Sequence, residues 1–490
     1  MFSLGELLRK ECVKWMMIGL GVLLIVASLL FYWMLFIRLS NDGLDFGNAV
    51  RIPAEMAFRI NEEGAKEFDL RVQHGEMEFF QGQPANTFGV NGAYLGPTIR
   101  AKRGERVILN VHNELKESTT MHWHGMHVPA KMDGTPHQTI QPSKKWTADY
   151  VITQEAGTMW YHPHTHGKTA TQVYQGIAGL FIIDDDNSQS LDLPDTYGVD
   201  DIPLIIQDRL FNEDGSLNYQ IRTGANYGDT ILVNGTYNPH LEVEARKIRF
   251  RILNGSNARI YWLGFEDQRS FQQIATDGGF LDSPVLTKRV RLSPGERAEI
   301  VVDFSDGKPI KLKSFPEAGL FNTSQAWFGQ TTNGHFDILQ IRPQTTTRES
   351  HSVPETLNQI QRIEPESATI TRPMVLGGMV INGKSMDMNR IDEHVRLGDT
   401  EIWRIRNQTG RTHPFHVHLV QFLILDRNGR PPSIQESGWK DTVHVASGET
   451  VNVIMEFKQY ADPEVPYMYH CHILEHEDMG MMGQFIVSEN

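Results

Sequence analysis

Short runs in which apolar and polar residues alternate recur along most of the chain, separated by Gly, Pro, Asn and Asp. Examples are RVILNVHN at 106–113, EIWRIRN at 401–407 and VNVIMEF at 451–457. Alternation with a period of two places every second side chain on one face of a strand, and Val, Ile, Thr and aromatic residues favour the pleated backbone. The pattern therefore predicts an all-β protein built from antiparallel strands.

Three segments of the chain share one sequence frame. VNGAYLGPTIRAKRGERVILNVHN ends at Asn113, VNGTYNPHLEVEARKIRFRILN at Asn254, and INGKSMDMNRIDEHVRLGDTEIWRIRN at Asn407. Each is followed by a second segment that is similar in all three units: QPSKKWTADYVI, SPGERAEIVVDF and ASGETVNVIMEF. An internal repeat indicates copies of one folding unit. We expect three β-rich domains, over residues 53–186, 200–343 and 373–490, with a polar linker over residues 344–372.

Residues 16–37 form an uncharged apolar run that is long enough to span a bilayer as a helix. Arg9, Lys10 and Lys14 precede it, and positive residues remain on the cytoplasmic side. We expect residues 1–40 to form a cytoplasmic stub and a single-pass anchor in the cytoplasmic membrane, with the body on the periplasmic or extracytoplasmic side. A cleaved signal peptide is the alternative, but the run is longer than a usual signal core and no Ala-x-Ala-like site follows it.

Composition narrows the class of protein. The chain has 490 residues and a formal net charge of −14, which argues against a nucleic-acid partner and for a surface that tolerates cations. It has 2 cysteines, too few for a disulfide framework. Because Cys12 lies beside the apolar run, we expect Cys471 to be either a free thiol or a metal ligand.

Histidine pairs of the form His-x-His occur at matching places of the frame in the first and third units. The middle unit carries Leu263 and Phe265 at the first of these places. Residues i and i+2 of a strand face the same side, so each pair presents two imidazoles in one direction. We expect eight histidines to meet where the first and third units face each other. They are His122, His124, His162, His164, His416, His418, His470 and His472.

A second site is predicted in the third unit alone. Cys471 lies between two of the paired histidines, so its side chain points to the opposite face of the strand. His413 and His476 have no histidine at the corresponding positions of the first unit, and Met481 follows the cysteine by ten residues. Imidazole suits copper, zinc or iron, but two His, one Cys and a distant Met describe a blue-copper electron-transfer site.

Four motifs carry a family resemblance. HWHG, HPHTHG, HPFHVH and HCHILEHEDMGMM resemble the copper signatures of the multicopper oxidases, GWKDTV at 438–443 is a further similar stretch, and the match runs from about residue 50 to 490. The resemblance implies three cupredoxin-like Greek-key domains and four copper ions per chain. It assigns His122 and His416 to the type 2 copper, and it assigns His413, Cys471, His476 and Met481 to the type 1 copper. The two type 3 coppers would be held by His124, His162 and His472, and by His164, His418 and His470.

Two carboxylates match the acids of that family. Asp133 follows His122 by eleven residues, and Glu477 follows His476 directly. Dioxygen reduction to water consumes protons, so we expect both to serve as proton-relay residues, the alternative being solvated loop carboxylates. No motif claims His112, His127, His137, His166 or His444, which we expect to support the ligands or the fold.

The expected activity is oxidation of a donor coupled to the reduction of dioxygen to water. A copper-free scaffold protein, like those relatives that have lost their ligands and serve cell division, is the alternative from another class, but every ligand is present here. A two-domain copper nitrite reductase would need a different layout. The linker 344–372 has no Met, and Met374, Met379, Met386 and Met388 after it are interpreted as core residues. We therefore expect a monomeric, laccase-like enzyme acting on phenolic or aromatic-amine donors, with ferrous ion second and cuprous ion third.

Overall fold

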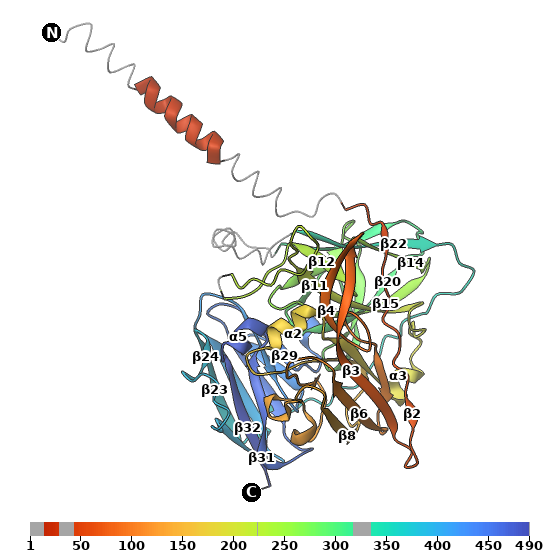
Figure 1. Cartoon of the computed structure of the whole chain (residues 1–490), viewed down its shortest axis with the longest axis vertical. Helices are drawn as coiled ribbons and strands as arrows, with labels where there is room; N and C mark the ends of the chain where they lie inside the picture. Colours follow the sequence, from red (N-terminus) through yellow and green to blue (C-terminus); the bar gives the residue numbers. More distant parts are fainter. Residues whose placement is uncertain (1–13, 29–43, 223, 317–334, 490) are drawn as a thin grey trace, which may run out of the picture.

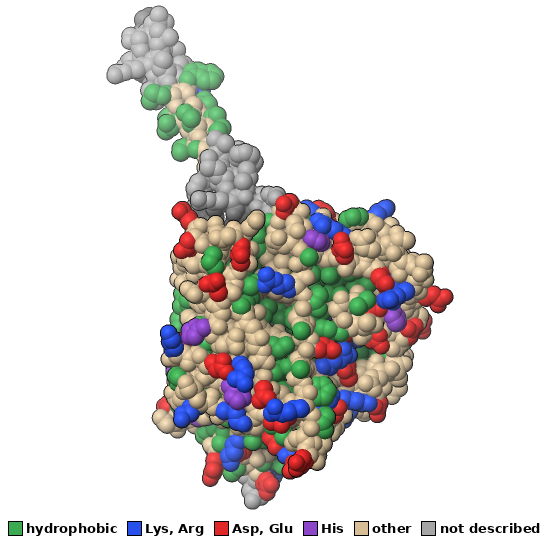
Figure 2. Space-filling view, turned by 45° about the vertical axis from the view of Figure 1, so that its right-hand side comes forward, with side chains coloured by type: hydrophobic (Ala, Val, Ile, Leu, Met, Phe, Trp, Pro, Cys, Tyr) green, Lys and Arg blue, Asp and Glu red, His purple; other side chains and the backbone are tan. Residues whose placement is uncertain are grey.

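The computed structural model describes residues 14–28, 44–222, 224–316 and 335–489. The body consists of three β-sandwich domains, coloured orange to brown, green, and blue in chain order in Figure 1. On the face drawn in Figure 2, acidic and basic side chains are interspersed, so the negative net charge is not gathered in one region of that face.

The first domain is a sandwich of two sheets around one apolar core. One sheet has the order β2-β3-β6-β8, with β4 paired to β3, and the other has the order β5-β10-β9-β7. The strands are β2 (Arg59–Ile60), β3 (Lys66–Phe80), β4 (Gln83–Val90), β5 (Ile99–Lys102), β6 (Arg106–Asn113), β7 (His122–His124), β8 (Lys145–Val151), β9 (Gly157–His162) and β10 (Gly179–Asp184). Short helices lie in the connections: η1 (Ala130–Met132), η2 (Pro136–Gln138), α2 (Thr169–Gln175) and α3 (Asp186–Ser190).

The second domain has the same two-layer construction. Its sheets have the orders β13-β12-β11-β15-β20-β17-β18 and β1-β14-β22-β21-β16-β19, so the strand that precedes the first domain pairs with the second. The strands are β1 (Asn48–Ala49), β11 (Asp201–Arg209), β12 (Thr230–Val233), β13 (Thr236–Tyr237), β14 (Pro239–Glu244), β15 (Lys247–Asn254), β16 (Tyr261–Phe265), β17 (Phe271–Thr276), β18 (Gly279–Thr287), β19 (Val290–Leu292), β20 (Arg297–Asp303), β21 (Ile310–Ser314) and β22 (Phe336–Gln344).

The third domain repeats the construction with sheets of order β24-β23-β26-β30-β28 and β25-β32-β31-β27-β29. The strands are β23 (Ile370–Gly377), β24 (Val380–Ile381), β25 (Glu393–Arg396), β26 (Thr400–Asn407), β27 (His413–Val417), β28 (Phe422–Arg427), β29 (Thr442–Val445), β30 (Thr450–Glu456), β31 (Asp462–Cys471) and β32 (Met482–Ser488). The helices are η3 (Pro365–Ser367), η4 (Ile434–Glu436) and α5 (Leu474–Asp478).

The expectation of antiparallel strands holds for most strand pairs but not for all. Each of the six sheets contains a parallel pair: β3–β6 and β5–β10, β11–β15 and β14–β22, and β23–β26 and β25–β32. In each pair the chain crosses between the two sheets before the partner strand forms, so the partners run in the same direction. The alternation of apolar and polar residues indicates which face of a strand is buried. Whether two paired strands run in the same direction depends instead on these crossovers.

The asparagine that ends each repeat motif has the same structural role in all three domains. Its side-chain amide donates to a backbone carbonyl of the following loop and to a carbonyl 27 or 38 residues further along, and its side-chain oxygen accepts from the amide nitrogen two residues ahead. These residues are Asn113, Asn254 and Asn407, which end β6, β15 and β26. In the first and third domains this loop leads to a strand that carries histidines, β7 or β27.

The segment between the second and third domains packs against the body. Val353 and Leu357 join an apolar cluster with Ala156 of the first domain and Phe280 of the second. Farther along, Ile360 packs on Leu423 of the third domain. The segment therefore contacts all three domains.

Residues 14–28 form a helix whose apolar side chains are exposed. Among the described residues no helix is both long enough and apolar enough to cross a bilayer. The predicted span, residues 16–37, lies partly outside the described residues, and the membrane anchor stays a prediction.

Candidate metal centres

The structure brings the eight paired histidines together between the first and third domains. Strand register pairs His122 of β7 with His162 of β9, and in the same way His416 of β27 with His470 of β31. All eight side chains are buried. The middle domain has Leu263 and Phe265 at the corresponding place, and both lie in its apolar core.

Ring nitrogens sort six of these histidines into two sets of three. Nε2 of His162 and Nε2 of His472 lie 3.4 and 3.3 Å from Nδ1 of His124. In the second set, Nε2 of His164 and Nε2 of His418 lie 3.2 and 3.3 Å from Nε2 of His470. The remaining two, His122 and His416, each have a buried Nε2 that makes no hydrogen bond within the described part of the chain.

The donor set fits metal ions. A buried polar atom without a partner is rare in folded proteins, and here such nitrogens converge from several strands. Burial, followed by the neighbouring imidazoles, lowers the pKa of seven rings, to about 3 for His470; the other six are His124, His162, His164, His416, His418 and His472. These seven rings are therefore neutral at physiological pH, which is the form that binds metals.

Asp133 and Asp441 hold the outer nitrogens of four of these rings in a mirrored pattern. The backbone carbonyl of Asp133 accepts from Nδ1 of His122 (2.9 Å), and its Oδ2 accepts from Nδ1 of His418 (2.7 Å). The backbone carbonyl of Asp441 accepts from Nδ1 of His416 (2.8 Å), and its Oδ1 accepts from Nε2 of His124 (2.9 Å). Each aspartate thus supports one histidine of its own domain through the backbone and one of the other domain through the side chain.

Ring stacking follows the same symmetry. His122 stacks on His418 with ring centres 3.9 Å apart, and His124 stacks on His416 at 3.8 Å. Because Nε2 of His124 donates to Asp441, its Nδ1 is the nitrogen directed at His162 and His472. The supporting carboxylate therefore decides which nitrogen is offered to a metal.

Glu477 reaches the second set of three from the other side. Its Oε1 lies 3.2 Å from Nδ1 of His164, and its Oε2 lies 3.3 Å from Nδ1 of His470. Burial, assisted by the neighbouring Asp478, raises the pKa of the Glu477 carboxyl well above its usual value. The group is therefore suited to carry a proton beside the histidines.

The second predicted site lies within the third domain. The sulfur of Cys471 is 3.3 Å from Nδ1 of His413 and 3.5 Å from Nδ1 of His476, and these two nitrogens are 3.2 Å apart. Thr409 Oγ1 lies 2.9 Å from Nε2 of His413, which leaves Nδ1 to face the sulfur. Met481 is buried, its amide donates to the carbonyl of His476, and its carbonyl accepts from the amide of Cys471. Two imidazole nitrogens and one cysteine sulfur therefore converge, and backbone hydrogen bonds hold Met481 next to them.

Comparison with known proteins decides the family. Models of the multicopper oxidase family match residues 71–188 and 350–490. The chain is 38% identical to a multicopper oxidase of Staphylococcus aureus over 448 residues, covering 90% of this chain and 93% of that protein. This chain belongs to the multicopper oxidase family. It is an oxidoreductase that uses dioxygen, and the family implies that its buried histidine clusters bind copper.

Two further relatives bear on fold and function. A laccase from Pediococcus acidilactici superposes with a TM-score of 0.82 at 36% identity, covering 90% of this chain and 93% of that one. The sandwiches of this oxidase are therefore cupredoxin-like. The chain is also 37% identical to the cell division protein FtsP of Salmonella typhimurium over 427 residues, covering 86% of this chain and 89% of that protein.

The histidines that no motif claims do not join either cluster. His112 lies 3.3 Å from Asp69, Nε2 of His137 contacts Gln484, and Nδ1 of His444 contacts Ser293. Both ring nitrogens of His127 are buried without a hydrogen-bond partner among the described residues, and His166 is exposed. In this oxidase the outer nitrogens of the ligand rings contact instead Asp133, Asp441, Glu477, Thr409 and backbone carbonyls.

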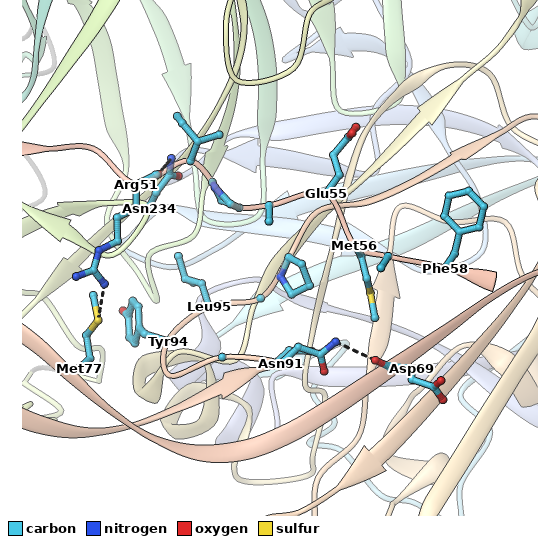
Figure 3. A pocket seen from close by; sticks show the side chains of 18 of the residues that line it. Arg51, Glu55, Met56, Phe58, Asp69, Met77, Asn91, Tyr94, Leu95 and Asn234 are labelled. Carbon is cyan, nitrogen blue, oxygen red and sulfur yellow. Dashed lines mark hydrogen bonds between the residues drawn. The ribbon is translucent and has the colours of Figure 1, made fainter.

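Sequence reasoning missed the roles of Asp441 and Thr409. Asp441 lies in GWKDTV, so its family-like context was visible, but its distance of 317 residues from His124 gave no signal of contact. Thr409 follows Asn407 by two residues and carries no motif. A surface pocket of about 670 Å³, lined by Arg51, Met77, Tyr94 and others, does not belong to either metal site, since none of its described lining residues is a histidine or cysteine (Figure 3).

Proposed function

We propose that this protein is a membrane-anchored, monomeric, laccase-like multicopper oxidase that binds four copper ions. Type 1 copper would be held by His413, Cys471, His476 and Met481, and type 2 copper by His122 and His416. The two sets of three histidines described above would hold the type 3 pair. The anchor would be residues 16–37, with the body on the outer side of the cytoplasmic membrane.

The position of Cys471 carries the proposal. Its sulfur belongs to the site of the third domain, while its neighbours in sequence, His470 and His472, belong one to each set of three. Cys471 is therefore joined to a residue of the histidine cluster by a single peptide bond on each side, to His470 and to His472. When bound, copper supplies one-electron oxidation of a donor at the first site and reduction of dioxygen to water at the second.

The carboxylates are assigned to proton supply on their contacts. Asp133 supports His122 and His418, and Glu477 lies beside His164 and His470, so each reaches the histidine cluster from a different side. General acid–base groups must lie within hydrogen-bond reach of the proton they move or be joined to it by one water. Both lie within hydrogen-bond distance of rings of the cluster, which supports this assignment.

The edge of the Cys471 site supports an aromatic donor. A Cβ placed on Gly224, in a loop of the second domain, would lie 3.9 Å from Nε2 of His476 and 3.5 Å from Nη1 of Arg411. A glycine adds no side chain of its own between the loop and the ring, and the positive charge of Arg411 disfavours the approach of a metal cation. The methionine-free segment 345–369 packs on the domain cores instead of on this site.

A specific contact favours metal-ion oxidation as the second candidate. The interpretation of four methionines as core residues holds for Met374, but Met379, Met386 and Met388 are only partly buried. The Met379 methyl carbon lies 3.2 Å from the same Cβ position on Gly224. A thioether near the edge of the site suits a cuprous ion, so this contact supports cuprous oxidation, which the sequence alone ranks third.

Donor kinetics test the proposal. Catalytic efficiency would be measured on copper-loaded protein with a methoxyphenol, ferrous ion and cuprous ion, for the wild type and for Met379→Leu, with Met374→Leu as a matched core control. We expect the phenol to rank first, and we expect Met379→Leu to leave its oxidation unchanged. Phenol turnover that requires added copper, together with a selective loss of cuprous oxidation in Met379→Leu, would show instead that a metal ion is the donor.

Copper loading decides between the enzyme and the scaffold that the likeness to FtsP suggests. All twelve ligand residues are present in this chain, so we expect a blue protein with about four coppers per chain. A colourless protein after full loading would support the scaffold.

Membrane fractionation of the full chain against a chain beginning at residue 44 tests the anchor, since only the full chain should sediment with membranes after a carbonate wash.

A further inference from the structure

One guanidinium of the ligand-free middle domain lies at the point where all three domains meet. Arg297 begins β20 and is fully buried. Its Nε donates to the carbonyl of Thr158 in the first domain (2.8 Å), and its Nη2 donates to the carbonyl of Asp277 in the second (2.9 Å). The two terminal nitrogens also hold both carboxylate oxygens of Asp441 in the third domain, at 2.8 and 2.6 Å.

The turn before Arg297 also reaches the histidine cluster. Gly295 has a φ of +83°, and a Cβ there would lie 3.0 Å from three atoms of the His472 ring. Gly125, directly after His124, is equally restricted, because its Cβ would lie 2.6 Å from Asp441 and 2.8 Å from Arg297. The backbone is thus fitted closely around the contact between Arg297, Asp441 and His124.

The mirrored aspartates differ in this one partner. Asp133 and Asp441 support two histidines each in the same manner, but only Asp441 is paired with an arginine. The carboxylate oxygens of Asp133 instead face ring nitrogens: Oδ2 accepts from Nδ1 of His418, and Oδ1 lies 3.3 Å from Nδ1 of His122. A carboxylate that accepts from two parallel N–H groups of one guanidinium has a fixed plane.

We propose that Arg297 is a positioning residue of the three-copper site, acting through Asp441 to hold His124 in the tautomer that directs Nδ1 at His162 and His472. The middle domain thereby takes part in building a site to which it contributes no ligand. Asp133, the mirrored carboxylate, has no arginine partner among the described residues. The inference rests on copper binding at the eight-histidine cluster.

An arginine is required for this role by geometry. Its planar fork donates to Asp441 through two nitrogens while Nε reaches the first domain, whereas a lysine presents one compact ammonium. Arg297→Lys should therefore preserve the charge and lose the fixed plane. Arg297→Gln should lose both.

The test compares copper occupancy of the two sites. Wild type, Arg297→Gln, Arg297→Lys, Asp441→Asn and the double variant Arg297→Gln/Asp441→Asn would be loaded with copper. Total copper per chain, the blue absorption of the Cys471 site and the paramagnetic resonance of the remaining copper would then be recorded. Arg251→Gln is the matched control, because Arg251 is a buried arginine of the same domain, paired with Asp201 and Glu299.

We expect Arg297→Gln to keep the blue absorption and to bind copper at the histidine cluster about 10- to 100-fold more weakly, with Arg297→Lys intermediate. Asp441→Asn should match Arg297→Gln, and the double variant should be no weaker than either, because the arginine acts through the aspartate. Arg251→Gln should load like the wild type.

Normal loading of the cluster in Arg297→Gln would overturn the inference. If that variant fails to fold, Asp441→Asn decides, and full cluster occupancy in it has the same consequence. A double variant in which the two losses add would show that Arg297 acts independently of Asp441. Failure of the wild type itself to bind copper would instead refute the proposed function.

Discussion

The two metal sites of this oxidase are built on different scales. His413, Cys471, His476 and Met481 all come from the third domain, on β27, β31, α5 and the turn before β32. The eight-histidine cluster draws its rings from two domains, and its support from three, through Asp133, Asp441 and Arg297. The first site depends on the folding of one domain, and the second depends on how three domains pack.

Cross-domain contacts show what fixes that packing. Asp478 of the third domain accepts from the amides of Thr169 and Ala170, the first residues of α2 in the first domain. The α2 N-cap residue, Lys168, makes no side-chain cap of its own. Because α2 follows the strand that ends at His162, the cap ties the ligand segment of one domain to the α5 segment of the other.

Removing the sulfur should separate the two sites most strongly. In Cys471→Ser we expect the blue absorption and the donor oxidation to fall to background. The copper bound by the histidine cluster should remain, so the total copper per chain should fall by about one ion. Cys12→Ser, which changes the only other cysteine, should keep colour and activity. Loss of the cluster copper in Cys471→Ser would mean that the sites do not assemble independently.

Proton supply should affect only the larger site. Glu477→Gln and Asp133→Asn should slow oxygen uptake by about 10²- to 10⁴-fold, because each removes a general acid–base group. Stopped-flow bleaching of the blue absorption by the donor should stay as fast as in the wild type, and exposed Glu464→Gln should be unaffected in both assays. Slower bleaching in proportion to slower turnover would place the defect at the Cys471 site.

The domain contact at α2 should contribute a smaller, measurable stability. Asp478→Asn replaces one of the two accepting oxygens by an amide nitrogen, so we expect a loss of about 1 kcal/mol in the free energy of unfolding. Chemical denaturation of copper-free protein would measure it, with exposed Asp186→Asn as a control. No change in Asp478→Asn would indicate that the three domains are held by their apolar contacts without this cap.

The most local effect is expected inside the third domain. Thr409→Val removes the hydrogen bond to Nε2 of His413 while keeping the shape of the side chain. Copper affinity of the Cys471 site should fall by about 10-fold, with a small shift of the blue band and no change at the histidine cluster. Altered cluster spectra in Thr409→Val would contradict the local character of this site.

The sequence by itself determined the strand-forming segments, the threefold repeat and the identities of the clustered residues. These features are local: alternation marks the buried face of a strand, and the spacing of His122 and His124 places both rings on one side of β7. The equivalence of Asn113, Asn254 and Asn407 located the ligand strands before any contact was known.

Only the tertiary structure decided which ring nitrogens meet and what holds them. The nitrogen that His124 offers depends on Asp441, 317 residues away, and Asp441 in turn depends on Arg297 of the middle domain. The parallel strand pairs and the partial exposure of Met379 also escaped the sequence pattern. The physical reason is common to all of these. The periodicity of a sequence indicates on which face of its strand each residue lies. Crossover direction, histidine tautomer and ion pairing depend instead on contacts between segments that are distant in the sequence.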